Sequence, residues 1–262
     1  MSGWRNIKLT LAYDGTNYHG WQRQQGQGSI QGVVEERIAR MTGENMPLHG
    51  AGRTDAGVHA LGMVANFHTR SPIPCPGFWK GLNGLLPGDI RVLQVEEAAP
   101  EFHARYQALG KRYVYNISLG AVPLPTARLY TVHVAADLDL TAMQACLAQL
   151  VGRHDFTSFA AAGADYPVAG RAKGAIRRIF SAKLGSGGRS PAQISIELTG
   201  DGFLRHMVRN IVGTLLEVGR GRRPVADFQR VMAARSRPAA GPTAPAHGLF
   251  LMEVYYEELP LL

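Results

Sequence analysis

The sequence predicts an α+β protein made of two halves, and three observations carry this prediction. Stretches with the two-residue alternation of strands are interleaved with stretches that have the period of about 3.6 residues of helices. Gly120, Pro123 and Pro125 interrupt this order near the middle, and a similar order of elements begins again after them. The length of 262 residues, 45% of them hydrophobic, suits one large domain or two ordinary ones. We therefore expect an N-terminal half over residues 1–122 and a C-terminal half over residues 123–262.

The first half begins with a strand, because apolar and polar residues alternate from Ile7 to Tyr13 before the turn signal Asp14-Gly15. A helix is expected from Ser29 to Met41, since apolar residues recur there at helical spacing, with Ser29 as the N-cap and Gly43 as the stop. Three further stretches have the pattern of strands and one that of a short helix: strands 62–69, 90–95 and 106–119, and helix 78–86.

The second half repeats this mixture. We expect strands over 131–134, 176–184, 193–198 and 249–256, and helices over 140–151, 204–218 and 225–234. The Pro- and Ala-rich stretch 235–246 is expected to be a mobile connection before the last strand. Together the two halves are expected to be ferredoxin-like and to form one continuous, mostly antiparallel sheet, with helices on one face and a central basic cleft.

Arginine dominates the charge of the chain. The formal net charge is +8, and because only five of the 28 basic residues are lysines, 23 are arginines. The guanidinium fork matches phosphate in a bidentate manner and stacks on bases, so a polyanion such as nucleic acid is the partner that composition favours. A GC-rich genome, which also favours arginine, alanine and glycine, is the alternative explanation, and composition alone leaves both open.

Cysteine usage and the N-terminus favour the cytoplasm. Cys75 and Cys146 lie far apart and form no C-x-x-C pair, so neither a disulfide framework nor a cysteine metal site is indicated. The N-terminus runs directly into the first expected strand without the apolar segment of a signal peptide, and no apolar run approaches a membrane span. The histidines show no H-E-x-x-H motif and the glycines no nucleotide-binding spacing, so we expect neither a metal nor a cofactor.

The segment from Gly50 to Ala60, G-A-G-R-T-D-A-G-V-H-A, is the most unusual in the chain. Its glycines allow close backbone approach, and its small side chains leave room for a substrate ring around Asp55. Arg53 is two residues away, and a carboxylate near a guanidinium stays ionised and available as a nucleophile or a base. The alternative is a structural turn in which Arg53 and Asp55 merely pair with each other.

This segment closely resembles the signature of the TruA family of tRNA pseudouridine synthases. Further resemblances extend over nearly the whole chain, and they lie at Y-D-G-T-N-Y-H-G-W-Q-R-Q (13–24), L-P-G-D-I (86–90), F-H-A-R-Y (102–106), K-R-Y-V-Y (111–115), H-D-F-T-S-F (154–159), M-V-R-N-I-V-G (207–213) and G-L-F-L (248–251). The resemblance implies a cofactor-independent isomerase that converts uridine to pseudouridine in the anticodon stem-loop of tRNA, at positions 38, 39 and 40. It also implies a homodimer.

The resemblance assigns roles to five residues. Asp55 is the catalytic residue, and Arg53 takes part in displacing or replacing the target base. Tyr113 stacks on that base, an interaction worth about 1–3 kcal/mol per base; without the motif, Tyr113 would be taken for a core residue of a strand. Arg209, on a helix with an apolar stripe, is the basic partner of Asp55, against the alternative of a solvated salt bridge. Leu249 packs against the base or Tyr113.

The reaction itself leaves one choice open. Asp55 is expected either to attack C1′ of the ribose or to remove a proton from C2′, and the sequence does not decide between them. Arginines near Arg23, Arg105, Arg112 and Arg171 are expected to bind phosphates. Two other hypotheses compete. One is a catalytically inactive RNA-binding or RNA-chaperone protein, which would not need Asp55. The other is a different Asp-dependent enzyme that acts on nucleosides or glycosides, which would normally need a second carboxylate.

Overall fold

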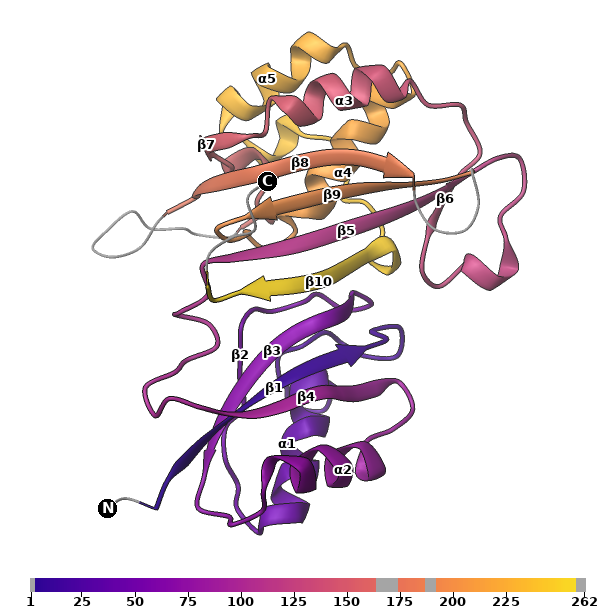
Figure 1. Cartoon of the computed structure of the whole chain (residues 1–262). Helices are drawn as coiled ribbons and strands as arrows, with labels where there is room; N and C mark the ends of the chain where they lie inside the picture. Colours follow the sequence, from indigo (N-terminus) through magenta and orange to yellow (C-terminus); the bar gives the residue numbers. More distant parts are fainter. Residues whose placement is uncertain (1–2, 164–173, 187–191, 258–262) are drawn as a thin grey trace. The chain divides into compact units, whose positions relative to one another are not determined.

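The computed structural model describes residues 3–163, 174–186 and 192–257, and these form two compact units (Figure 1). The first unit contains the described residues up to Leu109 and residues 250–257, which include all but the first residue of the last strand. The second unit is Gly110–Leu249. Both units combine a mostly antiparallel sheet with helices, which confirms the expected mixed α/β class.

The sheet of the first unit is built around β1 (Arg5–Tyr13). This strand lies between β3 (His59–Thr69) and β4 (Ile90–Ala98) and pairs with both in antiparallel register. Two shorter pairings extend β3: β2 (His49–Gly50) is antiparallel to it, and β10 (Leu249–Tyr255) is parallel to it, with Phe250 opposite His59. The last strand of the fold therefore joins the sheet that the first strand begins.

Two helices pack on one face of this sheet, α1 (Ile30–Thr42) and α2 (Cys75–Leu85) (Figure 1). The alternation in β1 turns three residues inward, and they form the core with apolar residues of both helices: Ile7, Leu9, Leu11, Ile30, Val34, Ile38, Phe78 and Leu82. Ser29 caps α1 by accepting a hydrogen bond from the Gly32 N–H, and Gly43 ends it with a φ of 74°. Both predicted ends of this helix are confirmed.

The strands of the second unit pair in the order β5 (Gly110–Leu119), β9 (Gln193–Gly200), β8 (Ile176–Ser186) and β7 (Gly152–Asp155), all antiparallel. A short strand, β6 (Val132–Val134), runs parallel to the end of β5. Its helices are α3 (Leu140–Ala148), α4 (Met207–Gly219) and α5 (Val225–Ala234). Four single 3₁₀ turns complete the described fold, at Pro125–Ala127, Thr157–Phe159, Arg237–Ala239 and Ala246–Gly248.

Helix α4 is buried along most of its length, and the stretch 235–246 packs against it. A side chain at Gly213 would lie 1.7 Å from the Pro242 carbonyl oxygen, so the two backbones touch. Asn210 is fully buried, and its side-chain oxygen accepts hydrogen bonds from Arg237 and Thr243. The expectation of a mobile connection here was wrong, because backbone contact and buried hydrogen bonds hold it in place.

The element predictions differ from the structure in further respects. Residues 106–109 precede β5, residues 204–206 precede α4 and residues 149–151 follow α3, and the short strands β2 and β7 have no predicted counterpart. The structure places β5 with the second unit because β5 pairs with β9, so the units divide at Leu109 and Gly110 instead of at the expected residues 122 and 123. Ferredoxin-like halves, a continuous sheet and a central basic cleft stay predictions.

Candidate active site

Asp55 lies in the loop that connects β2 to β3 in the first unit. The Val58 N–H donates to the Asp55 carbonyl oxygen at 3.1 Å, which closes a turn. Gly57 lies within this turn and has a φ of 75°. Ala51, Thr54 and Val58 are buried, whereas Asp55 is partly exposed and Arg53 is exposed. The loop therefore anchors itself through small and apolar side chains and leaves its two charged side chains accessible.

Arg53 has no ion pair or hydrogen bond from its side chain within the described residues. The alternative in which Arg53 and Asp55 merely pair within a structural turn therefore does not hold. An exposed guanidinium that no carboxylate engages is available to a ligand, and its planar face suits stacking on a base.

The Asp55 loop is held by the end of β1 and by the segment that follows it. The Tyr13 hydroxyl lies 2.8 Å from Oγ1 of Thr54, and both side chains are buried. The Trp21 N–H donates to the Thr54 carbonyl oxygen at 3.0 Å. Gly20 has a φ of 90°, and a Cβ there would lie 2.5 Å from the same carbonyl oxygen. Three contacts thus fix the backbone immediately before Asp55.

His59 fixes the other end of the loop. This histidine is only 1% exposed, and its ring stacks on Phe250 at 4.6 Å between centroids. Its Nδ1 lies 3.1 Å from the backbone nitrogen of Gly15. The Asp14 carboxylate lies 3.1 Å from the same nitrogen. Buried contacts thus secure the loop at both ends.

Tyr113 lies on β5 in the second unit. It is 7% exposed, and its ring meets that of Phe203 edge to face, with centroids 5.0 Å apart and planes at 77°. This T-shaped contact is a favourable arrangement for two aromatic rings. Phe203 precedes α4, so the aromatic pair joins the sheet to the segment that leads into the helix that carries Arg209.

Arg209 and the turn before Leu249 come together in the second unit. The Arg209 Nε donates to the Ala244 carbonyl oxygen at 2.8 Å, and the Ala244 N–H donates back to the Arg209 carbonyl oxygen at 3.1 Å. The Tyr115 hydroxyl donates to the Pro245 carbonyl oxygen at 2.8 Å. Leu249 begins β10 and is 5% exposed. Residues 244–249 are therefore tied to both α4 and β5.

Tyr115 is a residue of this cluster to which sequence reasoning gave no role. Its ring is fully buried, and a Cβ at Gly248 would lie 2.9 Å from it. Burial raises the pKa of the Tyr115 hydroxyl, and the positive charge of Arg209 opposes that rise. Its position two residues after Tyr113, on the same face of the strand, was the available signal. Tyr13, Gly20 and Trp21 were missed in the same way, since their motif had been noted without a role.

The five predicted residues divide between the units: Asp55 and Arg53 belong to the first, and Tyr113, Arg209 and Leu249 to the second.

Within the described residues, no group of three or more His, Cys, Asp or Glu side chains is arranged to hold a metal ion. No described helix is both long enough and apolar enough to cross a membrane.

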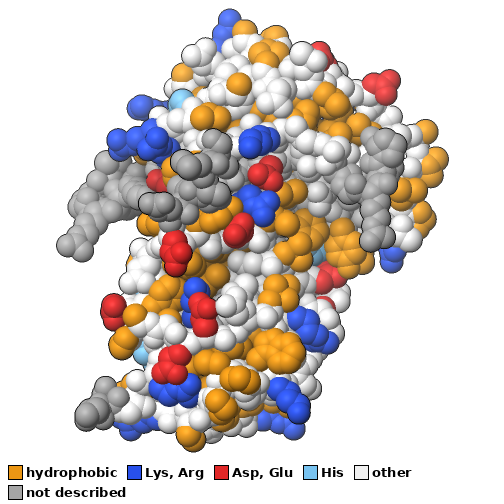
Figure 2. All heavy atoms as spheres, in the orientation of Figure 1, with side chains coloured by type: hydrophobic (Ala, Val, Ile, Leu, Met, Phe, Trp, Pro, Cys, Tyr) orange, Lys and Arg blue, Asp and Glu red, His pale blue; other side chains and the backbone are white. Residues whose placement is uncertain are grey.

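The expected phosphate-binding arginines have different surroundings. Arg112 forms an ion pair with Glu197 at 3.2 Å, and the Arg105 guanidinium lies 6.0 Å from the Tyr106 ring centroid. Arg23 forms an ion pair with Glu35 at 3.3 Å, and Arg171 lies outside the described residues. On the face drawn in Figure 2, Lys and Arg side chains are interspersed with Asp and Glu side chains.

The family model described as tRNA pseudouridine synthase matches residues 10–107 and 146–257. The chain belongs to the tRNA pseudouridine synthase family. A tRNA pseudouridine synthase A 1 from Desulfotalea psychrophila is 49% identical over 252 residues, which are 96% of this chain and all of that protein. A tRNA pseudouridine synthase A from Acetivibrio thermocellus is 46% identical over the same shares of both chains. The expected membership of the TruA family is confirmed.

Among solved structures, this tRNA pseudouridine synthase is similar to a Cbf5-Nop10-Gar1 complex at a TM-score of 0.30 and 11% identity, over 80% of this chain and 54% of that chain. The synthase isomerises uridine to pseudouridine in tRNA. The two competing hypotheses, an inactive RNA-binding or RNA-chaperone protein and a different Asp-dependent enzyme on nucleosides or glycosides, were therefore wrong. The matched residues include the Asp55 loop, Arg209 and Leu249, whereas Tyr113 lies between the two matched stretches.

Proposed function

We propose that this synthase modifies uridines 38, 39 and 40 in the anticodon stem-loop, and that Asp55 is its catalytic residue. The observation that carries the catalytic assignment is the Asp55 loop itself. Its backbone is fixed by Thr54, Gly20 and Trp21, while the carboxylate stays partly exposed among small side chains. A rigid loop that presents one accessible acid is what a reaction at a single sugar carbon requires.

The reaction rearranges bonds without gain or loss of atoms. The bond from C1′ to N1 breaks, the uracil rotates, and a bond from C1′ to C5 forms, while the proton lost from C5 is balanced by the one that N1 gains. Asp55 either attacks C1′ and is later displaced by C5, or removes the C2′ proton and later returns it. In both routes the carboxylate must be ionised at the start.

The other four residues are proposed to support this step. Arg209 would keep Asp55 ionised and oriented, because a neighbouring cation favours the charged form of a carboxyl group. Tyr113 and Leu249 would hold the flipped base, which regains by stacking the energy lost on leaving its helix. Arg53, exposed and without a partner among the residues that the structure describes, would fill the position that the base vacates. A homodimer and a cytoplasmic location stay predictions.

Replacement of Asp55 tests the catalytic proposal. Asp55→Asn keeps the size of the side chain but removes the ionisable oxygen, so pseudouridine formation is expected to fall by about a thousandfold or more. The affinity for tRNA is expected to stay within about twofold, because phosphate contacts dominate binding. The measurements are single-turnover formation of pseudouridine, mapped by nucleotide position, and equilibrium binding of tRNA.

The control is Glu101→Gln, which removes an exposed carboxylate of the same unit outside the Asp55 loop and should keep wild-type turnover. Full activity of Asp55→Asn would contradict the catalytic role. Product formed only outside positions 38, 39 and 40 would contradict the anticodon assignment and leave the role of Asp55 standing.

A further inference from the structure

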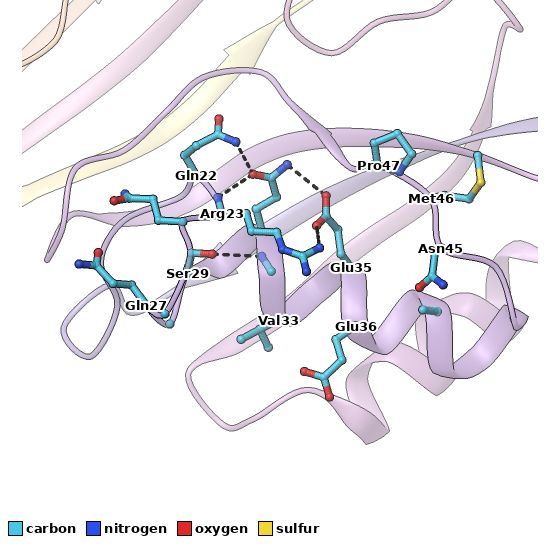
Figure 3. Close-up of a pocket in the computed structure, with 16 residues that line it drawn as sticks. Gln22, Arg23, Gln27, Ser29, Val33, Glu35, Glu36, Asn45, Met46 and Pro47 are labelled. Carbon is cyan, nitrogen blue, oxygen red and sulfur yellow. Dashed lines mark hydrogen bonds and ion pairs between the residues drawn. The ribbon is translucent and has the colours of Figure 1, made fainter.

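A pocket of about 980 Å³ lies in the first unit, beside the start of α1 (Figure 3). One wall is polar and comes from the chain before the helix, with Gln22, Arg23 and Gln27. Met46 and Pro47 form an opposite, less polar wall (Figure 3). This volume is in the range of pockets that hold small molecules, and the lining combines hydrogen-bonding amides with apolar surface.

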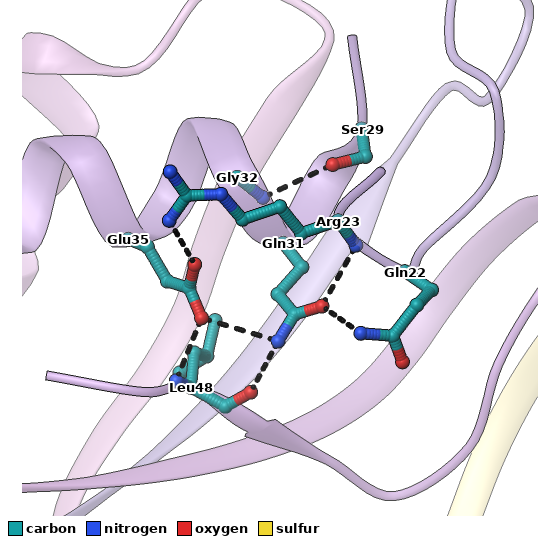
Figure 4. Close-up of polar contacts among 7 residues, drawn as sticks. All are labelled: Gln22, Arg23, Ser29, Gln31, Gly32, Glu35 and Leu48. Atoms are coloured by element: carbon teal, nitrogen blue, oxygen red, sulfur yellow. Dashed lines mark hydrogen bonds and ion pairs between the residues drawn. The ribbon is translucent and has the colours of Figure 1, made fainter. Parts of the chain in front are cut away.

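Gln31 fixes the polar wall through four hydrogen bonds (Figure 4). Its side-chain oxygen accepts from Gln22 Nε2 and from the Arg23 N–H, both at 2.9 Å. Its side-chain nitrogen donates to Glu35 Oε1 at 3.1 Å and to the Leu48 carbonyl oxygen at 3.0 Å. All four hydrogen-bonding positions shown for this amide are used inside the protein, so Gln31 serves to hold the wall and leaves ligand contacts to its neighbours.

Arg23 is held but still accessible. Its Nη1 donates to Glu35 Oε2 at 3.3 Å, while the other guanidinium nitrogens have no partner within the described part of the chain. The Arg23 side chain is 71% exposed, whereas that of Glu35 is 12% exposed. A carboxylate below the surface thus orients a guanidinium that keeps free donors for a ligand, and this lowers the entropy cost of binding.

The pocket is connected to the Asp55 loop through backbone hydrogen bonds. The Gln31 N–H donates to the Trp21 carbonyl oxygen at 3.0 Å, and the Trp21 N–H donates to the Thr54 carbonyl oxygen at 3.0 Å. Gln22 and Arg23 follow Trp21 directly. A ligand bound to the polar wall therefore contacts the same stretch of chain that fixes the residue before Asp55.

We propose that this pocket binds one nucleotide of the tRNA other than the uridine that reacts. Arg23 would bind its phosphate, the amides of Gln22 and Gln27 would hydrogen-bond to its base edge or ribose hydroxyls, and the wall of Met46 and Pro47 would cover a face of the base. Glu35 compensates the charge of Arg23, so an anion without a base would gain little here. The position of this nucleotide relative to the uridine that reacts rests on the proposed role of Asp55.

Three variants test the pocket by equilibrium binding of unmodified tRNA. Arg23→Ala removes the phosphate donor, and Ala39→Phe fills the pocket without a change in charge, since Ala39 lines it. We expect Arg23→Ala and Ala39→Phe each to weaken tRNA binding by about tenfold, which is the effect of losing one charge-assisted contact or the contacts of one base. Arg40→Ala is the matched control, because Arg40 is an exposed residue of the same helix that does not line the pocket.

The salt dependence of binding separates the two variants. Arg23→Ala should reduce the slope of log affinity against log salt by about one ion, and Ala39→Phe should leave the slope unchanged. Thermal melting verifies that each variant is folded. If Arg23→Ala and Ala39→Phe both bind tRNA as tightly as Arg40→Ala does, the proposal is overturned.

A second arm distinguishes tRNA from a free nucleotide as the source of the ligand. Uridine and adenosine monophosphates are titrated into the protein, and into its complex with tRNA. If a monophosphate binds saturably to the tRNA complex as tightly as to the protein alone, and Arg23→Ala weakens this binding, then tRNA does not occupy the pocket. That result would assign the pocket to free nucleotides and overturn the proposal. Activity retained by Asp55→Asn would instead remove only the proposed catalytic role, because the binding assays do not depend on turnover.

Discussion

At the scale of single residues, the position of Asp55 depends on a neighbour that has no side chain. Gly20 lies against the backbone of Thr54, Asp55 and Ala56, at distances that only a glycine allows. Its φ of 90° is also one that other residues adopt at a cost. Backbone contact of this kind transmits a displacement directly, because the atoms in contact are backbone atoms and no flexible side chain lies between them.

Gly20→Ala is therefore expected to reduce pseudouridine formation by about a hundredfold, the effect of moving a catalytic group by about 1 Å. Gly43→Ala is the matched control, because Gly43 also has a positive φ but has open space where its Cβ would lie. Both variants should lose some stability from the backbone strain, about 1–2 kcal/mol. Turnover and melting temperature, measured on both, separate strain from displacement. Equal turnover in the two variants would show that Gly20 does not position Asp55.

Helix α4 illustrates at the scale of elements how packing can reverse a local preference. Gly213 lies in the middle of the helix, where alanine would favour the helical state by about 1 kcal/mol. The Pro242 carbonyl oxygen occupies the place of the missing Cβ, and Gly241 likewise approaches Thr214. The glycine thus lets residues 240–244 lie directly on the helix that carries Arg209.

Gly213→Ala is expected to destabilise the protein by about 1–3 kcal/mol, as overpacking does, in spite of the better helix propensity. Gly84→Ala, in the exposed last turn of α2 with nothing near its Cβ position, should instead stabilise by up to about 1 kcal/mol. Thermal melting records both, at about 2–4 °C for each kcal/mol. Stabilisation by Gly213→Ala would mean that Pro242 moves away without cost.

Elements with a local signal were predictable from the sequence, and those that depend on distant residues were not. Ser29 and Gly43 marked the ends of α1 because caps act within one turn. Strand β2 has only two residues and exists through pairing with β3, so no periodicity revealed it. The stretch 235–246 has the composition of a mobile loop, and only its contacts with Asn210 and Gly213 fix it.

The same distinction applies to the candidate site. Asp55 and Arg53 stood out because several unusual residues are adjacent in the sequence. The support from Tyr13, Gly20 and Trp21 comes from more than thirty positions away, and nothing in their own segment says which loop they contact. Tyr115 was hidden for another reason: a buried aromatic residue on a strand is ordinary until Arg209 and Pro245 are found beside it.

At the scale of the whole molecule, the net charge of +8 now has an established partner, since the substrate is tRNA. Many of the basic side chains nevertheless pair with carboxylates, as Arg112 does with Glu197 and Arg223 with Glu217. Only those basic groups that release counterions from the RNA contribute to the salt dependence of binding. The slope of log affinity against log salt therefore reports the number of phosphate contacts, which the net charge of the protein does not.

Affinity for tRNA is expected to fall at least tenfold between about 50 and 200 mM KCl, because several phosphate contacts must each displace counterions. Equilibrium binding at a series of salt concentrations measures the effect. Melting curves over the same range show whether the protein itself responds to salt. A flat binding curve would argue that hydrogen bonds to bases, and not the arginines, provide most of the affinity.

The parallel pairing of β10 with β3 means that the second unit is inserted into the chain of the first. On the ribosome, β1, β3 and β4 are therefore made long before the strand that completes their sheet, with a delay of roughly ten to thirty seconds at ordinary rates of translation. During that interval the edge of β3 next to the Asp55 loop is uncovered, and Phe250 has not yet reached His59. The nascent Asp55 loop thus acquires the contact between His59 and Phe250 only as synthesis reaches the final strand.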